Sequence, residues 1–262
     1  MILITGAASG IGKALAERLI KNGNQLLLID LDGVKLRSIF EESDVVSLLS
    51  GDVSKKEFWK SVKDYLELRA IQASCLINSA GVIRPGFLLD YDLDDIDYHL
   101  DINAKGSILG TTILGRMMAN QGFGHIINIS SLAGLAPVSG LSLYAASKFA
   151  IRGFSLAIAP ELKKSGVDIS VVCPDLVKTP MLDLQLDYPE EAVLTFSGPE
   201  KILSPDDIIQ VILRLMQKPK RLVCIPESRG LLAKIAGTWP SLAEIFRASL
   251  EKKGKKTIQR LR

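Results

Sequence analysis

The residues whose spacing most clearly suggests chemistry are Tyr144 and Lys148, which stand four positions apart in a stretch with helical periodicity. Residues at i and i+4 share one face of a helix, so the ammonium group is expected near the phenol. Free tyrosine has a pKa of about 10, and a neighbouring positive charge favours the phenolate. Such a phenol could act as a general acid or base. The alternative is an ordinary aromatic–cation pair on an exposed helix.

A glycine-rich turn follows the first apolar run, where residues 5–12 read Thr-Gly-Ala-Ala-Ser-Gly-Ile-Gly before an amphipathic stretch. Glycines permit a tight turn and a close approach of the backbone to a ligand. The N-terminus of the helix beyond presents unpaired N–H groups and a positive dipole end, which suit a pyrophosphate. The alternative is a plain strand–helix connection, but the position at the start of a strand–helix–strand unit favours the pyrophosphate site.

An acidic residue, Asp30, ends the second predicted strand, 18 residues after Gly12. A carboxylate there typically accepts hydrogen bonds from the adenosine ribose hydroxyls. A 2′-phosphate would meet this carboxylate, at a cost of about 4 kcal/mol per like-charge pair at ~4 Å and an effective dielectric constant of ~20. No arginine or lysine inside the turn or directly after Asp30 offsets that cost. The sequence therefore favours NAD over NADP, whereas the alternative role of Asp30 is to cap the next turn.

Apolar runs alternate with amphipathic stretches along the chain, and they define the elements that must position these residues. Strands are predicted at 2–5, 25–30, 45–50, 73–78, 125–130, 168–173 and 221–225, and helices near 11–22, 33–42, 55–68, 92–120, 142–165 and 205–217. Strands that are apolar on both faces and separated by helices indicate a parallel sheet covered on both sides. Right-handed crossovers then give an α/β, doubly wound Rossmann fold with a seven-stranded parallel sheet.

Composition narrows the class of protein further. With 262 residues and 47% hydrophobic content, the chain can bury a full core, and a net charge of +3 carries no signature of nucleic-acid binding. No apolar run approaches the ~20 residues of a membrane span, and no charged segment precedes the first strand as in a signal peptide. We therefore expect one cytoplasmic domain over residues 1–228, followed by a basic tail over 229–262.

The cysteines and histidines give no indication of a metal site or a disulfide framework. Cys75, Cys173 and Cys224 lie in strand-like apolar runs, where buried thiols in a reducing compartment are expected. His99 is expected on the surface of a helix, and His125 at the start of a strand. Neither histidine has other metal ligands near it in the sequence, so no metal is predicted.

Taken together, these motifs resemble those of the classical short-chain dehydrogenase/reductase family over about residues 1–225. Further matches to the family are Asp52-Val53 after the third strand, Asn78-Ser79-Ala80-Gly81 for the N-N-A-G element, Asn103 in the central helix, Ser131 thirteen residues before Tyr144, and Tyr144 to Lys148 as Y-x-x-x-K. The first turn matches the T-G-x-x-x-G-x-G pattern. Each motif alone is common, whereas the complete series in this order is specific.

The resemblance implies an NAD-dependent oxidoreductase that interconverts a secondary alcohol and a ketone. Tyr144 would be the general acid/base, and Ser131 would stabilise charge on the substrate oxygen. Lys148 would bind the nicotinamide ribose, and Asn103 would hold a water that links Lys148 to solvent. The implied cofactor-binding residues are Gly6, Ser9, Gly10, Ile11, Gly12, Asp30, Asp52, Val53, Asn78, Ala80, Gly81, Tyr144, Lys148, Pro174, Val177 and Thr179.

The resemblance also implies a homodimer or homotetramer, assembled through the helices near 92–120 and 142–165. One departure from the family is Asp175, which follows Pro174 where a glycine is usual. Two alternatives stay open. The first is a sensor or scaffold that binds the nucleotide without turnover. The second is an NADPH-dependent reductase of long-chain, sphingoid-type ketones, which Asp175 and the apolar tail favour and Asp30 disfavours.

Residues 180–204 and 229–262 bear on the substrate and on partners. The first segment is too long for an ordinary connection and is predicted to be a substrate lid. Its apolar side chains either indicate an apolar, lipid-like substrate or simply pack the lid on the domain, and its acidic residues disfavour an anionic substrate.

The tail holds nine Lys/Arg and two Glu together with apolar anchors and Trp239. It predicts peripheral attachment to an anionic membrane surface, or a helix packed on the domain or on a neighbouring subunit.

Overall fold

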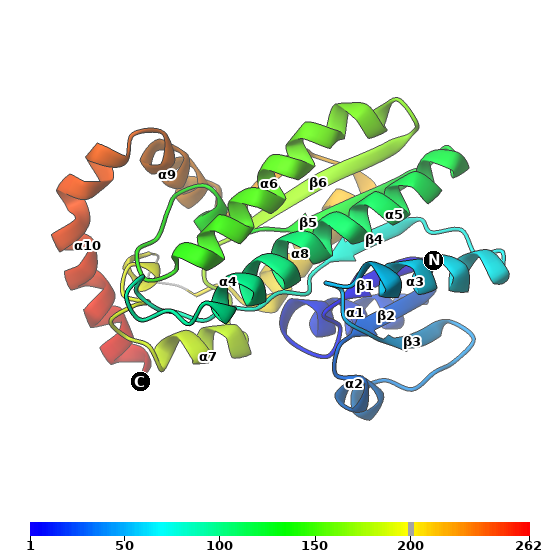
Figure 1. Cartoon of the computed structure of the whole chain (residues 1–262), viewed down its shortest axis with the longest axis horizontal. Coiled ribbons are helices and arrows are strands. Elements are labelled where there is room, and N and C mark those ends of the chain that lie inside the picture. The colour runs from blue at the N-terminus through cyan, green and yellow to red at the C-terminus, as the bar shows by residue number, and fades with distance from the viewer. Residues whose placement is uncertain (199–201) are drawn as a thin grey trace.

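A sheet of seven parallel strands forms the centre of the molecule in the computed structural model, which describes residues 1–198 and 202–262 (Figure 1). The strand order is β3-β2-β1-β4-β5-β6-β7. The strands are β1 (Ile2–Thr5), β2 (Leu26–Asp30), β3 (Val46–Ser50), β4 (Cys75–Asn78), β5 (Gly124–Ile129), β6 (Val167–Pro174) and β7 (Leu222–Ile225). The predicted doubly wound fold is confirmed, because the order reverses direction at β1 and β4.

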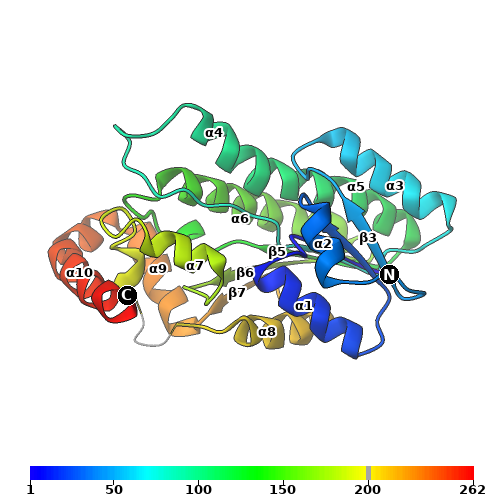
Figure 2. The same ribbon diagram turned by 90° about the horizontal axis from the view of Figure 1, so that it is seen from below.

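Helices cover both faces of this sheet, as Figure 2 shows from below. The helices of eight or more residues are α1 (Gly10–Lys21), α3 (Lys56–Leu68), α5 (Gly106–Gln121), α6 (Ser142–Lys163), α8 (Pro205–Gln217), α9 (Glu227–Thr238) and α10 (Pro240–Leu261). The shorter ones are α2 (Gly33–Ile39), α4 (Asp94–His99) and α7 (Pro180–Leu186). One core packs α1, α2 and α8 on the sheet, and the other packs α3, α5 and α6 on the opposite face.

Alternating side chains of each strand enter these two cores. In β1, Ile2 and Ile4 lie in the core with α1 and α8, whereas Leu3 lies in the core with α3 and α5. Successive side chains of a strand point to opposite faces. Because both faces are covered, the strand is apolar throughout, which is why continuous apolar runs identified the strands in the sequence.

The single helix expected over 92–120 is divided in the structure. The chain forms α4, then a π-helical turn over Leu100–Lys105, and then α5. His99, at the end of α4, is fully buried, so the prediction of a surface position was wrong. Its Nε2 accepts a hydrogen bond from the Arg84 N–H at 2.9 Å, and its Nδ1 lies 2.7 Å from the Asp95 carbonyl oxygen. Burial lowers the pKa of His99 and so favours the neutral ring. This ring links the backbone at Arg84 to α4.

The cysteines lie where their apolar surroundings predict, since all three are free and buried. Among the described residues, no helix is long and apolar enough to cross a bilayer. In the same part of the chain, no three His, Cys, Asp or Glu side chains gather into a group that could hold a metal ion.

The lid segment contains α7 and a short 3₁₀ turn, η3 (Thr195–Ser197), while its residues 199–201 lie outside the described residues. Figure 1 places α9 and α10 at one end of the molecule, where the C-terminal part of α10 lies beside α7. Ile258 of α10 enters a small core with lid residues, which also contains Leu176, Leu182, Ala192 and Phe196. The C-terminal helices therefore cover the lid.

Two glycines bring α9 and α10 into backbone contact with the domain. A Cβ atom on Gly237 would lie 2.0 Å from the Leu135 carbonyl oxygen, and one on Gly254 would lie 2.0 Å from the Val193 carbonyl oxygen. No side chain fits at either position, so glycine permits the close approach. One face of the tail is thus packed on the domain.

Gly254→Ala is expected to lower the free energy of unfolding by about 1–2 kcal/mol, because the new methyl group pushes α10 away from the lid. The matched control is Gly153→Ala in α6, where an added Cβ meets nothing within 4 Å. This control should raise stability by about 0.5–1 kcal/mol. Urea unfolding of both variants, with amide exchange over α10, measures the difference. Equal stability of the two variants would contradict the packing described for Gly254.

Candidate active site

A cavity of about 1520 Å³ opens at the carboxyl ends of the strands. Its wall includes the ends of β1, β2, β5 and β6, the lid, and the inner side of α9 and α10. Ligands of open α/β sheets bind at this edge. Most of the predicted site residues line it: Gly6, Ser9, Gly10, Ile11, Asp30, Asp52, Val53, Ala80, Gly81, Ser131, Tyr144, Lys148, Pro174, Val177 and Thr179.

The first turn has the geometry expected of a pyrophosphate site. Gly6 has φ of +69°, and a Cβ there would lie 2.8 Å from the Ala80 Cα. A Cβ on Gly12 would lie 2.2 Å from the Gly6 carbonyl oxygen, so only glycine lets α1 pack on the turn. The side chain of Ser9, the residue before α1, makes no capping bond to the helix. The first-turn N–H groups of α1 are thus left for an anionic ligand, and the site fits a dinucleotide phosphate.

Thr5 fastens this turn to the neighbouring loop, a role that the sequence reasoning missed. Its Oγ1 accepts hydrogen bonds from the N–H groups of Ser79 and Ala80, at 3.1 and 3.0 Å. The side chain is buried at the end of β1. Two features of the sequence could have indicated this role. Thr5 is a hydroxyl residue at the end of β1, and the neighbouring strand β4 leads into an Ala-Gly loop.

The Asp30 carboxylate accepts hydrogen bonds from two turns, and the residue also lines the cavity. Its Oδ2 accepts a hydrogen bond from the Ala8 N–H at 2.8 Å, and its Oδ1 accepts one from the Asp32 N–H at 3.0 Å. A carboxylate offers about four acceptor positions, so these bonds leave capacity for ribose hydroxyls. The capping role and the ribose role are therefore compatible.

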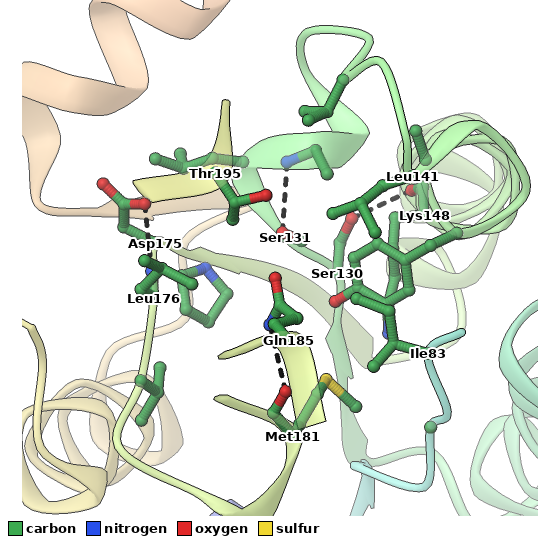
Figure 3. A pocket seen from close by; sticks show the side chains of 18 of the residues that line it. Ile83, Ser130, Ser131, Leu141, Lys148, Asp175, Leu176, Met181, Gln185 and Thr195 are labelled. Carbon is green, nitrogen blue, oxygen red and sulfur yellow. Dashed lines mark hydrogen bonds between the residues drawn. The ribbon is translucent and has the colours of Figure 1, made fainter. Parts of the chain in front are cut away.

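Ser131, Tyr144 and Lys148 meet where β5 ends and α6 begins. Figure 3 shows Ser131 and Lys148 in this part of the wall. The Ser131 Oγ accepts a hydrogen bond from the Ala133 N–H at 3.1 Å, which caps the following turn and leaves the hydroxyl hydrogen to be donated. The Lys148 Nζ donates to the Ile129 carbonyl oxygen at 3.0 Å. It lies 5.5 Å from the centroid of the Tyr144 ring. The expected helix-face pair is thus present, but inside the cavity wall and not on an exposed helix.

Burial shifts both titrating groups away from their charged forms. It raises the pKa of Tyr144 to about 12, although a hydrogen bond with Ser131 acts in the opposite direction. It lowers the pKa of Lys148 to about 8. The charge of Lys148 alone does not lower the pKa of Tyr144, because desolvation of the phenolate outweighs the attraction of an ammonium group beside the ring. The prediction of a lowered pKa relied on oxidised nicotinamide as a second positive charge.

Asn103 lies behind the cavity wall, inside the π-helical turn. Its Nδ2 donates to the Val82 carbonyl oxygen and to the Ser147 Oγ, both at 3.0 Å, and its Oδ1 accepts from the Val82 N–H at 2.7 Å. A Cβ on Gly81 would lie 3.2 Å from this Oδ1 and 3.5 Å from the Lys148 Nζ. The amide therefore ties the loop after β4 to α6 next to Lys148.

Asn78 and Gly12 also lie outside the cavity lining. The Asn78 Nδ2 donates to the Asn128 Oδ1 at 2.7 Å and to the Thr111 Oγ1 at 3.2 Å. This buried network joins β4, β5 and α5. The structure therefore brings most of the predicted residues together around one cavity, whereas Asn78, Asn103 and Gly12 support its frame.

Asp175, which departs from the family pattern, forms an ion pair with a residue of the C-terminal helices. Its Oδ2 lies 3.0 Å from the Nε of Arg229 in α9, and its side chain is 6% exposed. The sequence had assigned Arg229 only to the basic tail. A charged residue in an apolar strand end requires a partner, and this requirement was the signal that could have identified Arg229.

Lys148→Met is expected to raise the free energy of unfolding at pH 7 by an amount on the order of 2 kcal/mol. The lysine pKa falls from 10.5 to about 8 on folding, so between these values the unfolded chain binds a proton that the folded chain releases. Wild-type stability should therefore rise with pH over this window relative to the variant. Urea unfolding of both proteins from about pH 7 to about pH 10 gives this difference. A constant difference across the window would contradict the assignment.

Comparisons with known proteins agree with this arrangement. An uncharacterized oxidoreductase of Staphylococcus saprophyticus is 30% identical over 225 residues, which cover 84% of this chain and 92% of the relative. The solved structure of 4-hydroxyisoleucine dehydrogenase complexed with NADH superposes with a TM-score of 0.76 at 21% identity, over 85% of this chain and 95% of that one. The solved structure of levodione reductase superposes with a TM-score of 0.77 at 23% identity, over 88% of this chain and 97% of that one. These two structures show the fold alone.

The model of the short chain dehydrogenase family matches residues 1–187, which include the glycine turn, Ser131, Tyr144 and Lys148. This match covers more than half of the chain and agrees with the oxidoreductase relative. The chain therefore belongs to the short chain dehydrogenase family, and it is an NAD(P)-dependent oxidoreductase that acts on CH–OH groups.

Proposed function

We propose that this enzyme is NAD-dependent and interconverts a secondary alcohol and a ketone on an apolar or lipid-like substrate. The single observation that carries this proposal is the convergence of Ser131, Tyr144 and Lys148 in the cavity that also contains the glycine turn. A nicotinamide dinucleotide, when bound, supplies the hydride transfer and, in its oxidised form, a positive charge.

The residues of the chain then handle the proton. The Ser131 hydroxyl donates a hydrogen bond to the substrate oxygen and stabilises the negative charge that develops there. Tyr144 takes the hydroxyl proton during oxidation and returns it during reduction. Because its pKa is about 12 in the free protein, a second positive charge beside that of Lys148 brings it closer to the working range. Asn103, behind Lys148, would hold the water through which the proton leaves.

The preference for NAD rests on Asp30 at the end of β2. Leu31 and Asp32 follow it at the cavity, so this part of the wall offers no cation for a 2′-phosphate. Titration should give tighter binding of NAD than of NADP. Tighter binding of NADP would contradict this proposal and favour the NADPH-dependent long-chain ketone reductase.

The apolar substrate is supported by the apolar side chains of the cavity wall, of which Ile83, Leu141 and Met181 pack with Tyr144. The cavity residues of this kind include Ile83, Val138, Leu141, Met181, Leu184, Leu194, Leu232 and Phe246. Phe196 of the lid instead packs into the core with Ile258, and Leu182 contributes to both this core and the cavity wall. Some lid side chains thus hold the lid in place, and others face the substrate. A screen of secondary alcohols and ketones at the absorbance of NADH tests turnover.

The alternative of a nucleotide-binding sensor predicts a different result. A sensor binds the dinucleotide, shows no turnover with any alcohol or ketone, and needs no hydroxyl at position 144. Binding without turnover across the whole screen would support this alternative and contradict the enzyme mechanism proposed for Tyr144.

We also propose that the protein is cytoplasmic and attaches peripherally to an anionic membrane through the outer face of α9 and α10. The exposed apolar side chains there that do not line the cavity are Leu231, Trp239 and Ile245, and the exposed lysines are Lys234, Lys252, Lys253, Lys255 and Lys256. Apolar anchors followed by lysines suit a surface of anionic lipid. The protein should co-sediment with anionic vesicles at low salt, and Trp239→Ser/Ile245→Ser should reduce this. Wild-type protein that stays in the supernatant would contradict attachment.

We also propose how the chain is divided into a domain and a C-terminal segment, and how copies of it assemble. We regard residues 1–228 as the dinucleotide-binding domain, with residues 180–204 as its lid, and residues 229–262 as a C-terminal segment. A homodimer or homotetramer would form through α4, α5 and α6, as the family resemblance implies. Light scattering on the purified protein measures the assembly, and a monomer at all concentrations would contradict it.

A further inference from the structure

We propose that Gln185 and Thr195 form a second polar subsite in the substrate cavity, which binds a hydroxyl or N–H group of the substrate besides its reacting oxygen. This inference rests on the proposed function and specifies its substrate class. Both residues belong to the lid, Gln185 to α7 and Thr195 to η3, and both line the cavity.

The Gln185 side chain is 5% exposed, and its amide orientation is fixed. The Nε2 donates a hydrogen bond to the Met181 carbonyl oxygen at 3.1 Å. Only the amide nitrogen can make this bond, because a flipped amide would place two oxygen atoms together. The Oε1 is therefore the end of the amide that is left over, and it is buried without a hydrogen-bond partner among the described residues.

Thr195 presents the second unpartnered atom. Its Oγ1 is buried and has no hydrogen-bond partner in the described part of the chain. Figure 3 shows Gln185 and Thr195 on the lid side of the cavity, with the Gln185 amide oxygen directed towards the side where Ser131 and Thr195 lie. The polar atoms thus lie in the same cavity as the Ser131 hydroxyl, in a wall that is otherwise apolar around Met181.

The chemistry of these atoms determines which ligand group fits. An amide oxygen only accepts hydrogen bonds, whereas a threonine hydroxyl both donates and accepts. A buried acceptor without a partner is unfavourable, so a substrate that displaces water from the cavity must supply a donor there. A hydroxyl, amine or amide N–H satisfies Gln185, whereas a hydrocarbon chain or a carboxylate does not. The substrate class is an apolar alcohol or ketone with a second hydrogen-bond donor.

The test compares a long-chain secondary alcohol with matched diols that carry the second hydroxyl at successive carbons. Wild-type enzyme should have a kcat/KM for at least one diol about 10-fold or more above that of the simple alcohol, because one buried hydrogen bond discriminates by this order. Gln185→Leu should lower kcat/KM for that diol by about 5–100-fold, mainly through KM, and leave the simple alcohol within about twofold. Thr195→Val, which keeps the shape of the side chain, should act in the same direction.

Equal kcat/KM of the wild type for the alcohol and all the diols would overturn the inference, as would an equal loss for both substrates in Gln185→Leu with NAD binding intact. Failure of the proposed function has a different signature, which is no turnover of any alcohol while NAD still binds. In that case, thermal shifts of the NAD complex with the same compounds decide. A diol-specific shift that Gln185→Leu abolishes supports the subsite, and identical shifts in both proteins overturn it.

Discussion

Tyr144→Phe should lower kcat by about 10³-fold while leaving the Kd for the dinucleotide within about twofold. The variant keeps the ring that lies 5.5 Å from the Lys148 Nζ but has no proton to take up or return. General acid–base catalysis contributes roughly 10²–10⁴-fold, and Tyr144 is the phenol that is hydrogen-bonded with Ser131. Steady-state turnover at the absorbance of NADH and a fluorescence titration of cofactor binding measure the two effects.

Tyr65→Phe is the matched control for this substitution. It also removes a phenol hydroxyl, which bonds to the Ser47 Oγ at 2.9 Å, but Tyr65 is a partly buried residue of α3 that packs against the core and does not line the cavity. Turnover of this control should equal that of the wild type. Undiminished turnover by Tyr144→Phe, under conditions in which the control behaves normally, would rule out Tyr144 as the acid/base.

Arg229→Met should lower the free energy of unfolding by about 3 kcal/mol and loosen the cover of the cavity. The change leaves the Asp175 carboxylate, with a 6% exposed side chain, without its partner at 3.0 Å. Breaking a buried ion pair by removing one member is costly because the remaining charge stays desolvated. Urea unfolding measures the loss of stability. A raised KM would report the loosened position of α9.

The companion variant Arg229→Met/Asp175→Asn should recover most of that loss, because it removes the buried charge and keeps the side-chain shape. Arg18→Met is the matched control, since Arg18 pairs with Asp206 at 2.6 Å but both side chains are well exposed. Its cost should stay below about 1 kcal/mol. No recovery in the double variant would show that Arg229 acts through its packing and not through its charge.

Local patterns of the sequence predicted the sheet and the residues at its edge. β1 was predicted at 2–5 and spans Ile2–Thr5, because burial on both faces requires a continuous apolar run. Tyr144 and Lys148 could be predicted as a pair because they share a helix face, and the family resemblance added Ser131 at the end of the fifth strand. What escaped prediction depends on contacts distant in the chain, such as the pair of Asp175 and Arg229, which are 54 residues apart.

Contacts distant in the chain also explain the other differences between the sequence-based predictions and the structure. No local pattern marks the π-helical turn at Leu100–Lys105, whose extra residue places Asn103 between the loop after β4 and α6. Burial of His99 follows from its bond to the Arg84 N–H, a contact from outside its own helix. The raised pKa of Tyr144 likewise reflects the depth of the assembled cavity, which a sequence spacing of four residues does not convey.

Ile258 of α10 holds the lid although it follows the lid in the chain, and this placement affects the order in which the parts of the site can assemble during synthesis. The glycine turn, Asp30 and the residues from Ser131 to Lys148 leave the ribosome well before α9 and α10 do. A growing chain can therefore fold around the dinucleotide before it can enclose an alcohol or ketone. The wall of the cavity is complete only when α9 and α10 have also been made and have packed on the lid.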